Sequence, residues 1–328
     1  MENNNAENKM PTLEVEQSSD IDKLINDDIE TLDSDEIIEE DGRSGFIKLP
    51  HGLALTVEET YPITASEVSK TIILIGPFDS GKTTIETTIY QLFQRKPFAG
   101  LYFAGSQSLF GYEERSFYTR LESKKETATT PRTSRSVTEI FLHLKLYDSK
   151  TKIKTNYLFG DISGEEIYSH LGNVETISEK MAYLKSVDSY VFILNGKQLA
   201  DKNKRNGEID QAYNMARTIF DAKLYSSSTK VQVLISKYDI LKKNNDANLE
   251  AAIDKRIQCI VDLLKKYVSE VTVHRVAAMP EPGVLEVGYG LEELLSAWNK
   301  PHTGNQVVES YITDYKLNSE FNKLIYKM

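Results

Sequence analysis

The chain has 328 residues, of which 40% are hydrophobic and 27% are charged, with a formal net charge of −10. This balance is typical of a soluble globular protein with one large or two modest domains. A single cysteine excludes an internal disulfide, no stretch reaches the roughly 18 apolar residues of a membrane span, and the acidic N-terminus lacks the apolar core of a secretory signal, so we expect a cytoplasmic protein.

The negative charge is concentrated in residues 1–45, which hold fifteen Asp or Glu against three Lys or Arg. This segment has a net charge of −12, which leaves +2 for residues 46–328. The overall acidity argues against binding to nucleic acid. Residues 1–45 contain no aromatic side chain, a composition typical of a disordered, solubilising tail. The alternative is an acidic segment that docks on a partner or on basic loops of its own domain.

The next part of the chain begins with short apolar runs at 46–49 and 53–57, which predict a hairpin or a leading strand. A buried strand at 72–75 runs into an amphipathic helix at 83–94. Residues 97–136 show no single period and are rich in aromatic side chains. A connection of this length is usually functional or carries small elements of its own, and its aromatic residues either pack in the core or form a binding platform.

Alternating apolar residues over 140–146, followed by a strand at 154–159, predict an antiparallel hairpin at one edge of a sheet. Further buried strands are expected at 191–194, 231–235 and 271–276. Amphipathic helices lie between them at 209–220 and 253–268, and another helix follows at 291–298. This alternation predicts an α/β fold: a mostly parallel central sheet with one antiparallel edge strand and helices on both faces. We expect this domain to cover 46–300. A helical extension at 301–328 either packs on the domain or binds a partner.

Residues 76–83 read Gly-Pro-Phe-Asp-Ser-Gly-Lys-Thr and directly follow the strand at 72–75. This is the G-x-x-x-x-G-K-[ST] spacing of a phosphate-binding loop. Gly76 and Gly81 allow the backbone to wrap its N–H groups around an anion, and the start of the helix adds its positive dipole end. Lys82 would reach the terminal phosphates, and the Thr83 hydroxyl would hold Mg²⁺. The other expected nucleotide contacts in this loop are Asp79, Ser80 and Thr84.

The strand at 154–159 ends at Asp161-Ile-Ser-Gly164. An Asp-x-x-Gly pattern is weak by itself, but its position after a buried strand downstream of a phosphate loop strengthens it. Asp161 would hold Mg²⁺ through water, and the N–H of Gly164 would sense the γ-phosphate.

The first switch segment should lie shortly before the strand at 140–146. Thr130 and Thr133 are its candidate Mg²⁺ ligands, and we prefer Thr133. Arg132 and Arg135 lie beside them, either as arginine fingers in cis or as solvated loop residues.

The strand at 231–235 ends at Ser236-Lys237-Tyr238-Asp239, a variant of the Asn/Thr-Lys-x-Asp pattern that recognises guanine. The Asp239 carboxylate can accept hydrogen bonds from the ring N–H and the exocyclic amine of guanine, whereas adenine offers a bare acceptor at that edge. Lys237 would lie along the base and brace the phosphate loop. Ser236 is shorter than the usual Asn. After the last strand, Ala277 and Ala278 would supply backbone contacts to the base oxygen.

Together these motifs resemble the translation-factor-related and Ras-like class of P-loop GTPases over roughly residues 70–300. Four segments are more narrowly similar to the bacterial double-GTPase family, at 76–84, 91–100, 103–115 and 130–133. The resemblance implies a switch, controlled by GTP, GDP and Mg²⁺, that regulates partner proteins in multi-gene conflict or defence islands. Its partner-binding segments would be 101–136 and 163–182, which would bind other proteins or a second copy of the chain.

Two departures bear on catalysis. Glu165 follows the Asp-x-x-Gly pattern where Ras-like enzymes have a glutamine that positions the attacking water, so we expect slow GTP hydrolysis. Phe78 occupies a loop position that is often glycine, and its bulk could obstruct an arginine finger from a partner. Two alternative functions stay open: an ATP-using P-loop NTPase, suggested by Ser236, and a scaffold that binds nucleotide without hydrolysing it.

Overall fold

The computed structural model describes residues 50–117, 141–163, 167, 169 and 174–300, which belong to the unit Pro50–Met328. Several predictions fall on other parts of the chain. The acidic tail 1–45, the extension 301–328 and the residues Thr130, Arg132, Thr133, Arg135, Gly164 and Glu165 lie outside the described residues.

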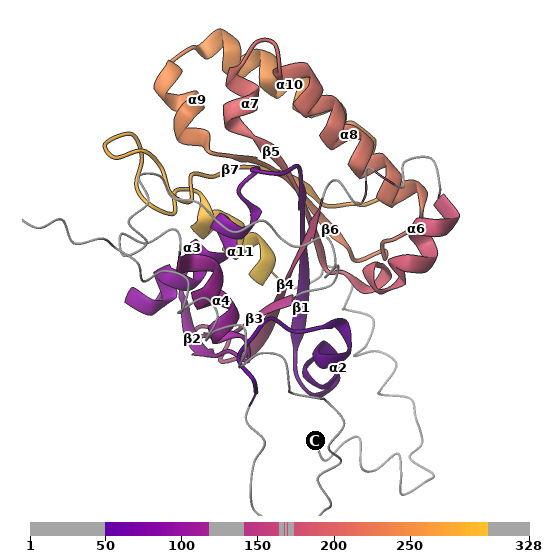
Figure 1. Ribbon diagram of the computed structural model, residues 1–328, viewed down its shortest axis with the longest axis vertical. Helices are drawn as coiled ribbons and strands as arrows, with labels where there is room; N and C mark the ends of the chain where they lie inside the picture. The colour runs from indigo at the N-terminus through magenta and orange to yellow at the C-terminus, as the bar shows by residue number, and fades with distance from the viewer. Residues whose placement is uncertain (1–49, 118–140, 164–166, 168, 170–173, 301–328) are drawn as a thin grey trace, which may run out of the picture. The chain divides into compact units, whose positions relative to one another are not determined.

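The described strands form a seven-stranded sheet with the order β2-β3-β4-β1-β5-β6-β7 (Figure 1). β3 pairs antiparallel with both of its neighbours, and the other pairings are parallel. The prediction of a mostly parallel sheet with one antiparallel strand is confirmed. The bounds are β1 Ser69–Gly76, β2 Leu101–Gly105, β3 Phe141–Asp148, β4 Lys154–Ser163, β5 Ser189–Asn195, β6 Lys230–Ser236 and β7 Val271–Arg275.

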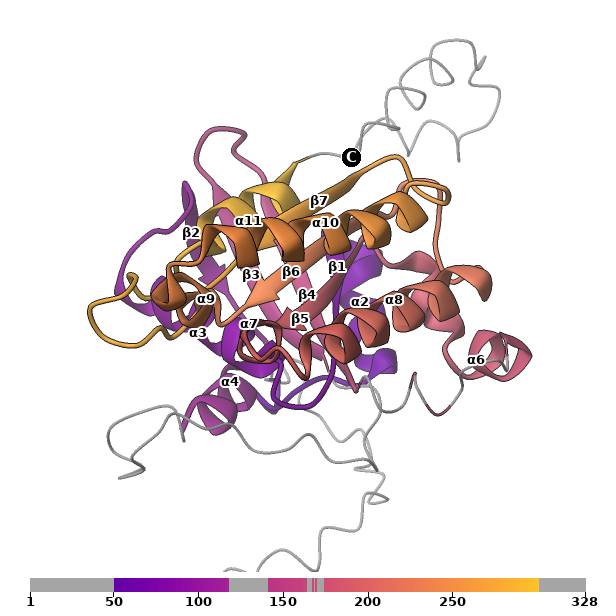
Figure 2. The same cartoon turned by 90° about the horizontal axis from the view of Figure 1, so that it is seen from above.

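Helices cover both faces of this sheet because its central strand is apolar on both sides. In β1, Ile73 and Ile75 pack in one core cluster, while Ile72 and Leu74 pack in the other. The first cluster includes side chains of α2, α6, α8 and α10, and the second includes those of α3, α4 and α11. Figure 2 shows α8 and α10 side by side over one face.

The helices described in the structure are α2 Val57–Ser66, α3 Lys82–Arg95, α4 Leu109–Ser116, α6 Val174–Lys180, α7 Gly196–Ala200, α8 Arg205–Asp221, α9 Tyr238–Asn244, α10 Ala247–Leu264 and α11 Leu291–Asn299, with a 3-10 turn η3 at Ala182–Ser186. In this part of the chain, no helix combines the length and the apolar composition that a bilayer crossing requires.

The expected hairpin or leading strand at 46–57 differs from the structure over residues 50–57. Leu55 makes one isolated bridge to Phe141, and helix α2 begins at Val57. The reason is a capping box: the Thr56 side chain accepts from the Glu59 N–H, and the Glu59 carboxylate accepts from the Thr56 N–H. These reciprocal bonds satisfy two donors and start a helix at that point.

The expected edge hairpin of β3 and β4 is present, but β2 pairs along the outer side of β3. Leu101 is buried, whereas Tyr102, Phe103 and Ala104 are all exposed, so this short strand has no inside-outside alternation. That burial pattern explains why the periodicity of residues 97–136 did not predict a strand.

Candidate functional site

The five parallel strands β4, β1, β5, β6 and β7 bring their carboxyl ends to the same edge of the sheet. In register, Gly76 of β1 pairs with Ser163 of β4, and Asn195 of β5 pairs with Ser236 of β6. Ligands of open α/β sheets bind outside the carboxyl ends of such strands. The predicted site residues from four sequence segments therefore meet here: Gly76, Asp79, Ser80, Gly81, Lys82, Thr83 and Thr84, then Asp161, then Ser236, Lys237 and Asp239, then Ala277 and Ala278.

The phosphate loop connects β1 to α3 and owes its shape to its two glycines. Gly81 has a φ of +89°, a conformation that side-chain-bearing residues rarely adopt. Gly76 packs so tightly that an added Cβ would lie 2.7 Å from the Ser80 Oγ. The Ile85 N–H donates to the Gly81 carbonyl at 2.9 Å, which closes the first turn of α3. The N–H groups of that turn have no intrahelical acceptor and so suit an anion.

Lys82 lies almost buried over the start of this loop. Its ammonium donates to the Gly76 carbonyl at 3.0 Å and to the Pro77 carbonyl at 3.3 Å, and it lies 3.7 Å from the Asp161 Oδ1. A single positive charge is thus held inside the curve of the loop, where a bound polyphosphate would be attracted to it.

A pair of side-chain oxygens lies beside Lys82. The Thr83 hydroxyl donates to the Asp161 Oδ2 at 3.1 Å, which joins the start of α3 to the end of β4. The described residues contain no group of three His, Cys, Asp or Glu placed to hold a metal. Two protein oxygens nevertheless fit Mg²⁺, which typically takes one or two from the protein and the rest from water and phosphates. One turn along α3, burial and then the Asp161 charge raise the pKa of Glu86, so that its neutral form is favoured.

The segment predicted to recognise the base contacts the phosphate loop directly. Lys237 has a φ of +48° at the end of β6, and its ammonium donates to the Asp79 carbonyl at 2.7 Å. The same ammonium forms an ion pair with the Asp79 carboxylate at 2.8 Å. Ser236 is buried, and its hydroxyl donates to the Leu194 carbonyl at 3.3 Å. This hydroxyl is therefore already hydrogen-bonded to the backbone of β5.

Asp239 is buried at the start of α9, with 5% of its surface exposed. Its Oδ2 accepts a hydrogen bond from the Glu281 N–H at 3.1 Å. The Glu281 carboxylate in turn pairs with Lys243 of α9 at 2.6 Å. Glu281 was not predicted from the sequence. The signal that could have found it is its position between Pro280 and Pro282, which makes its N–H the one donor available in that tripeptide.

The backbone after β7 closes into a loop beside Asp239. The Ala277 N–H donates to the Tyr289 carbonyl and the Gly288 N–H donates to the Ala278 carbonyl, both at 3.0 Å. Of the two backbone donors predicted for the base oxygen, the Ala277 N–H is thus already engaged within the loop. The ring of Tyr289 also stacks on that of Tyr238, with ring centroids 6.1 Å apart.

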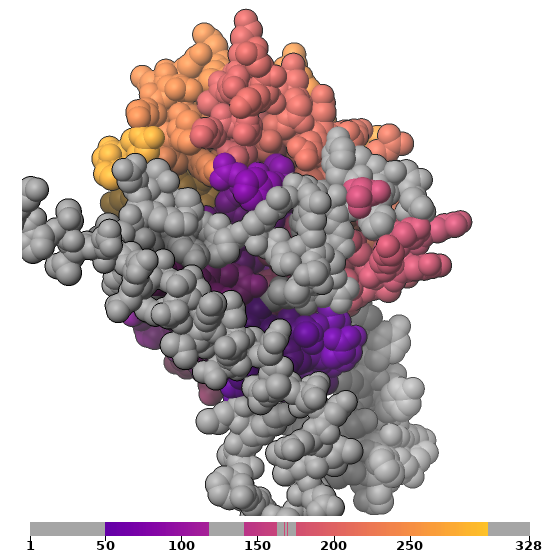
Figure 3. Space-filling model, viewed as in Figure 1, coloured from indigo at the N-terminus to yellow at the C-terminus, as the bar shows by residue number. Residues whose placement is uncertain are grey.

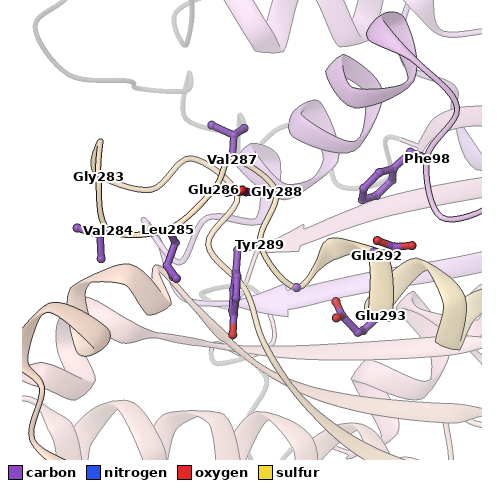
Figure 4. A pocket seen from close by; sticks show the side chains of 11 residues that line it. Phe98, Gly283, Val284, Leu285, Glu286, Val287, Gly288, Tyr289, Glu292 and Glu293 are labelled. Carbon is purple, nitrogen blue, oxygen red and sulfur yellow. The ribbon is translucent and has the colours of Figure 1, made fainter.

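The outer side of this loop carries a hollow of about 830 Å³. Figure 4 shows Val287 and Tyr289 projecting in opposite directions from the loop, with Phe98 across the hollow. Glu292 and Glu293 of α11 complete one wall. None of the lining residues is a predicted nucleotide contact, but Gly288 and Tyr289 are hydrogen-bonded to Ala278 and Ala277.

One further buried residue reaches the phosphate loop without having been predicted. Asn195, at the carboxyl end of β5, donates from its Nδ2 to the Asp79 carbonyl at 2.8 Å. Its backbone N–H donates to the Glu208 carboxylate at 2.6 Å. Burial raises the pKa of Glu208, and the bond from Asn195 opposes that shift. The available signal was position alone, because β5 lies between β1 and β6.

Comparison of the chain with known proteins identifies the family to which its sequence is matched. A family model described as Double-GTPase 2 matches residues 70–299. Among solved structures, the signal recognition particle receptor SRb-GTP/SRX complex from Chaetomium thermophilum matches with 14% identity and a TM-score of 0.35, covering 70% of this chain and 95% of that chain. A search of the curated proteins finds no match. The family match covers well over half of the sequence, and the chain belongs to the Double-GTPase 2 family.

Proposed function

We propose that this protein binds GTP and GDP with Mg²⁺, hydrolyses GTP slowly, and acts as a switch for partner proteins. One observation carries the proposal: a phosphate loop with a nearly buried lysine, a Thr83–Asp161 oxygen pair and the buried carboxylate of Asp239 all lie at the ends of neighbouring parallel strands. Each group has the chemistry that one part of a guanine nucleotide requires.

On the phosphate side, the N–H groups of the loop and of the first turn of α3 would surround the β- and γ-phosphates. Lys82 would neutralise part of their charge, since its ammonium already lies within the loop. Thr83 and Asp161 would hold Mg²⁺, which supplies charge stabilisation to the phosphates.

On the base side, the Asp239 carboxylate would accept from the ring N–H and the exocyclic amine of guanine. Adenine carries a ring acceptor at that edge, so it would set a lone pair against the buried carboxylate in place of two donors, which is costly. The stem of Lys237 would lie along the base while its ammonium stays on Asp79. This chemistry favours GTP over ATP.

Slow hydrolysis is proposed from two side chains. Glu165 occupies the position from which Ras-like enzymes use glutamine to orient water, and a carboxylate sits unfavourably beside a γ-phosphate. Phe78 lies on the outer side of the phosphate loop with 64% of its surface exposed, where it would meet an arginine supplied by a partner. Figure 3 shows the connection from β1 to α3 at the molecular surface beside the α7 and α8 segment.

The biological setting follows from the family resemblance. We propose that the GTP-bound form presents residues 101–136 and 163–182 to other proteins, or to a second copy of the chain, within a bacterial conflict or anti-phage defence system. The exposed aromatic side chains of β2, of α4 and of the residue that follows α4 support a binding role for the first segment. They include Tyr102, Phe103, Phe110 and Phe117.

The test is turnover and binding measured on the same preparation. Purified protein should bind labelled GTP and GDP in Mg²⁺ and release phosphate from GTP slowly, and Lys82→Ala should lose both activities. Binding without any phosphate release would favour a nucleotide-bound scaffold. Equal use of ATP and GTP would favour a different P-loop NTPase and contradict the assignment of Asp239.

A further inference from the structure

We propose that Asn195 is a positioning residue for the phosphate loop, which makes from β5 the contact that the short Ser236 side chain does not make from β6. The inference rests on the proposed nucleotide binding at this loop. It adds a residue that the sequence motifs do not include, and it explains how the site tolerates serine at the first position of its base-recognition segment.

The first argument is the backbone of the loop itself. Asp79 has a φ of +60°, a left-handed conformation that is unfavourable for residues with a side chain. Such a conformation persists when its surroundings fix it. Two donors converge on the Asp79 carbonyl: the Asn195 Nδ2 at 2.8 Å and the Lys237 Nζ at 2.7 Å. Asn195 and Lys237 together fix the direction of this peptide group.

The second argument is that Asn195 has no freedom to turn away. Its side chain is buried, with 1% of the residue exposed. The Oδ1 accepts from the Lys197 N–H at 3.0 Å and caps α7, so the amide nitrogen must face the phosphate loop. Its own N–H is fixed by the Glu208 carboxylate at 2.6 Å. Asn195 is therefore a rigid donor, whereas Lys237 reaches the same carbonyl through a long flexible chain.

The third argument is the neighbouring strand position. Ser236 pairs with Asn195 in the register of β6 and β5. A Cβ added at Gly81 would lie 3.8 Å from the Cβ of Ser236. Ser236 thus lies directly against the phosphate loop. Its hydroxyl, however, donates back to Leu194. A longer amide at position 236 has the proximity to reach the loop, while serine does not extend that far.

The sharpest test replaces the side-chain NH2 group of Asn195 with an oxygen. Asn195→Asp keeps the shape of the side chain and its acceptor for Lys197, but it places an oxygen opposite the Asp79 carbonyl. We expect affinity for GDP and GTP to fall by about tenfold or more, because a hydrogen bond becomes a repulsion. Asn203→Asp, in the exposed turn before α8, is the matched control and should bind as the wild type does.

A rescue variant separates positioning from folding. Asn195→Ala should bind GDP and GTP more weakly with its preference for GTP over ITP unchanged, since the base contacts are untouched. Asn195→Ala combined with Ser236→Asn should regain most of the lost affinity, because the amide returns from the adjacent strand. The thermal unfolding midpoint of each nucleotide-free variant is measured in parallel.

Wild-type affinity in Asn195→Asp would overturn the inference. So would a loss in Asn195→Ala that follows a lowered unfolding midpoint and is not recovered by Ser236→Asn. The same series is run with ATP, because the loop contact does not depend on the base. Weak guanine binding by the wild type would therefore refute the proposed GTP specificity, while the series with ATP would still decide the role of Asn195.

Discussion

Replacing Gly76 with alanine should displace the backbone of the phosphate loop. Gly76 ends β1, and an added Cβ would lie 2.7 Å from the Ser80 Oγ, 3.0 Å from the Ile193 carbonyl oxygen and 3.1 Å from the Ile193 Cβ. Real Cβ atoms essentially never approach within 3.0 Å, so the Ser80 side chain must move. Because Ser80 is fully buried within the loop, its movement displaces the loop backbone.

The expected loss in the free energy of unfolding follows from the tight packing around Gly76. Adding a methyl group to a filled core typically costs about 1–3 kcal/mol. A loss of about 2 kcal/mol would lower the unfolding midpoint by about 4–8 °C in a domain of this size. Affinity for GTP should fall by at least about tenfold as well, since the Gly76 carbonyl is one of the acceptors that position Lys82.

The assay uses the single tryptophan of the chain. Trp298 is 1% exposed in α11 and packs against Phe159 with ring centroids 5.5 Å apart, so its fluorescence reports unfolding of the core. Gly207→Ala is the matched control. Gly207 lies in α8 with no atom within 4 Å of an added Cβ, and its replacement should stabilise the helix by about 0.5–1 kcal/mol. Wild-type stability and GTP affinity in Gly76→Ala would refute this reasoning.

Three further predictions concern single contacts. Thr83→Ala should abolish most of the Mg²⁺ dependence of GTP binding, so chelation would weaken the wild type but hardly change the variant; equal chelator sensitivity would contradict the metal assignment. Burial lowers the pKa of His143 below 6.5, and its Nδ1 accepts from the Gln107 N–H at 2.9 Å. The unfolded chain therefore binds the proton more readily, and stability should fall as the pH drops below about 6.5, with a smaller fall in His143→Gln; parallel pH profiles of the urea midpoint would contradict this. Glu281→Pro removes the N–H bonded to Asp239 and should reduce the preference for GTP over ITP, whereas Glu281→Gln keeps that N–H and should keep the preference.

The sequence predicted the elements whose signals are local. The strand at 72–75 is apolar on both faces and leads into a glycine-containing loop, and β1, this loop and α3 are all present. The strands that carry Asp161 and Ser236 near their carboxyl ends were likewise predicted, because buried parallel strands are short apolar runs. The proximity of the predicted site residues to one another could then be inferred, because the carboxyl ends of parallel strands meet at one edge of the sheet.

Other elements were missed for identifiable reasons. The start of α2 has a local signal, Thr56 with Glu59 three residues later, but the apolar run before it was interpreted as a strand. The strand β2 is exposed at three of its five positions, and it is set by pairing with β3 rather than by its own pattern. Neither burial nor pairing partner is visible in a segment of that length.

The contacts that complete the site are non-local. Asn195 reaches Asp79 across 116 positions of sequence, and Glu281 reaches Asp239 across 42. No spacing rule connects such pairs, because the folded sheet alone brings them together. The polar strand ends of a parallel sheet are therefore worth treating as site candidates even where no motif includes them.

The most direct test of the account is competition between nucleotides at the base site. We predict that unlabelled GTP and GDP displace labelled GDP far better than ATP does, and that Asp239→Asn loses this preference and gains affinity for xanthosine triphosphate. The gain is expected because an amide can donate to the second carbonyl of xanthine, which a carboxylate repels. Equal displacement by ATP and GTP, unchanged in Asp239→Asn, would contradict guanine recognition at this site.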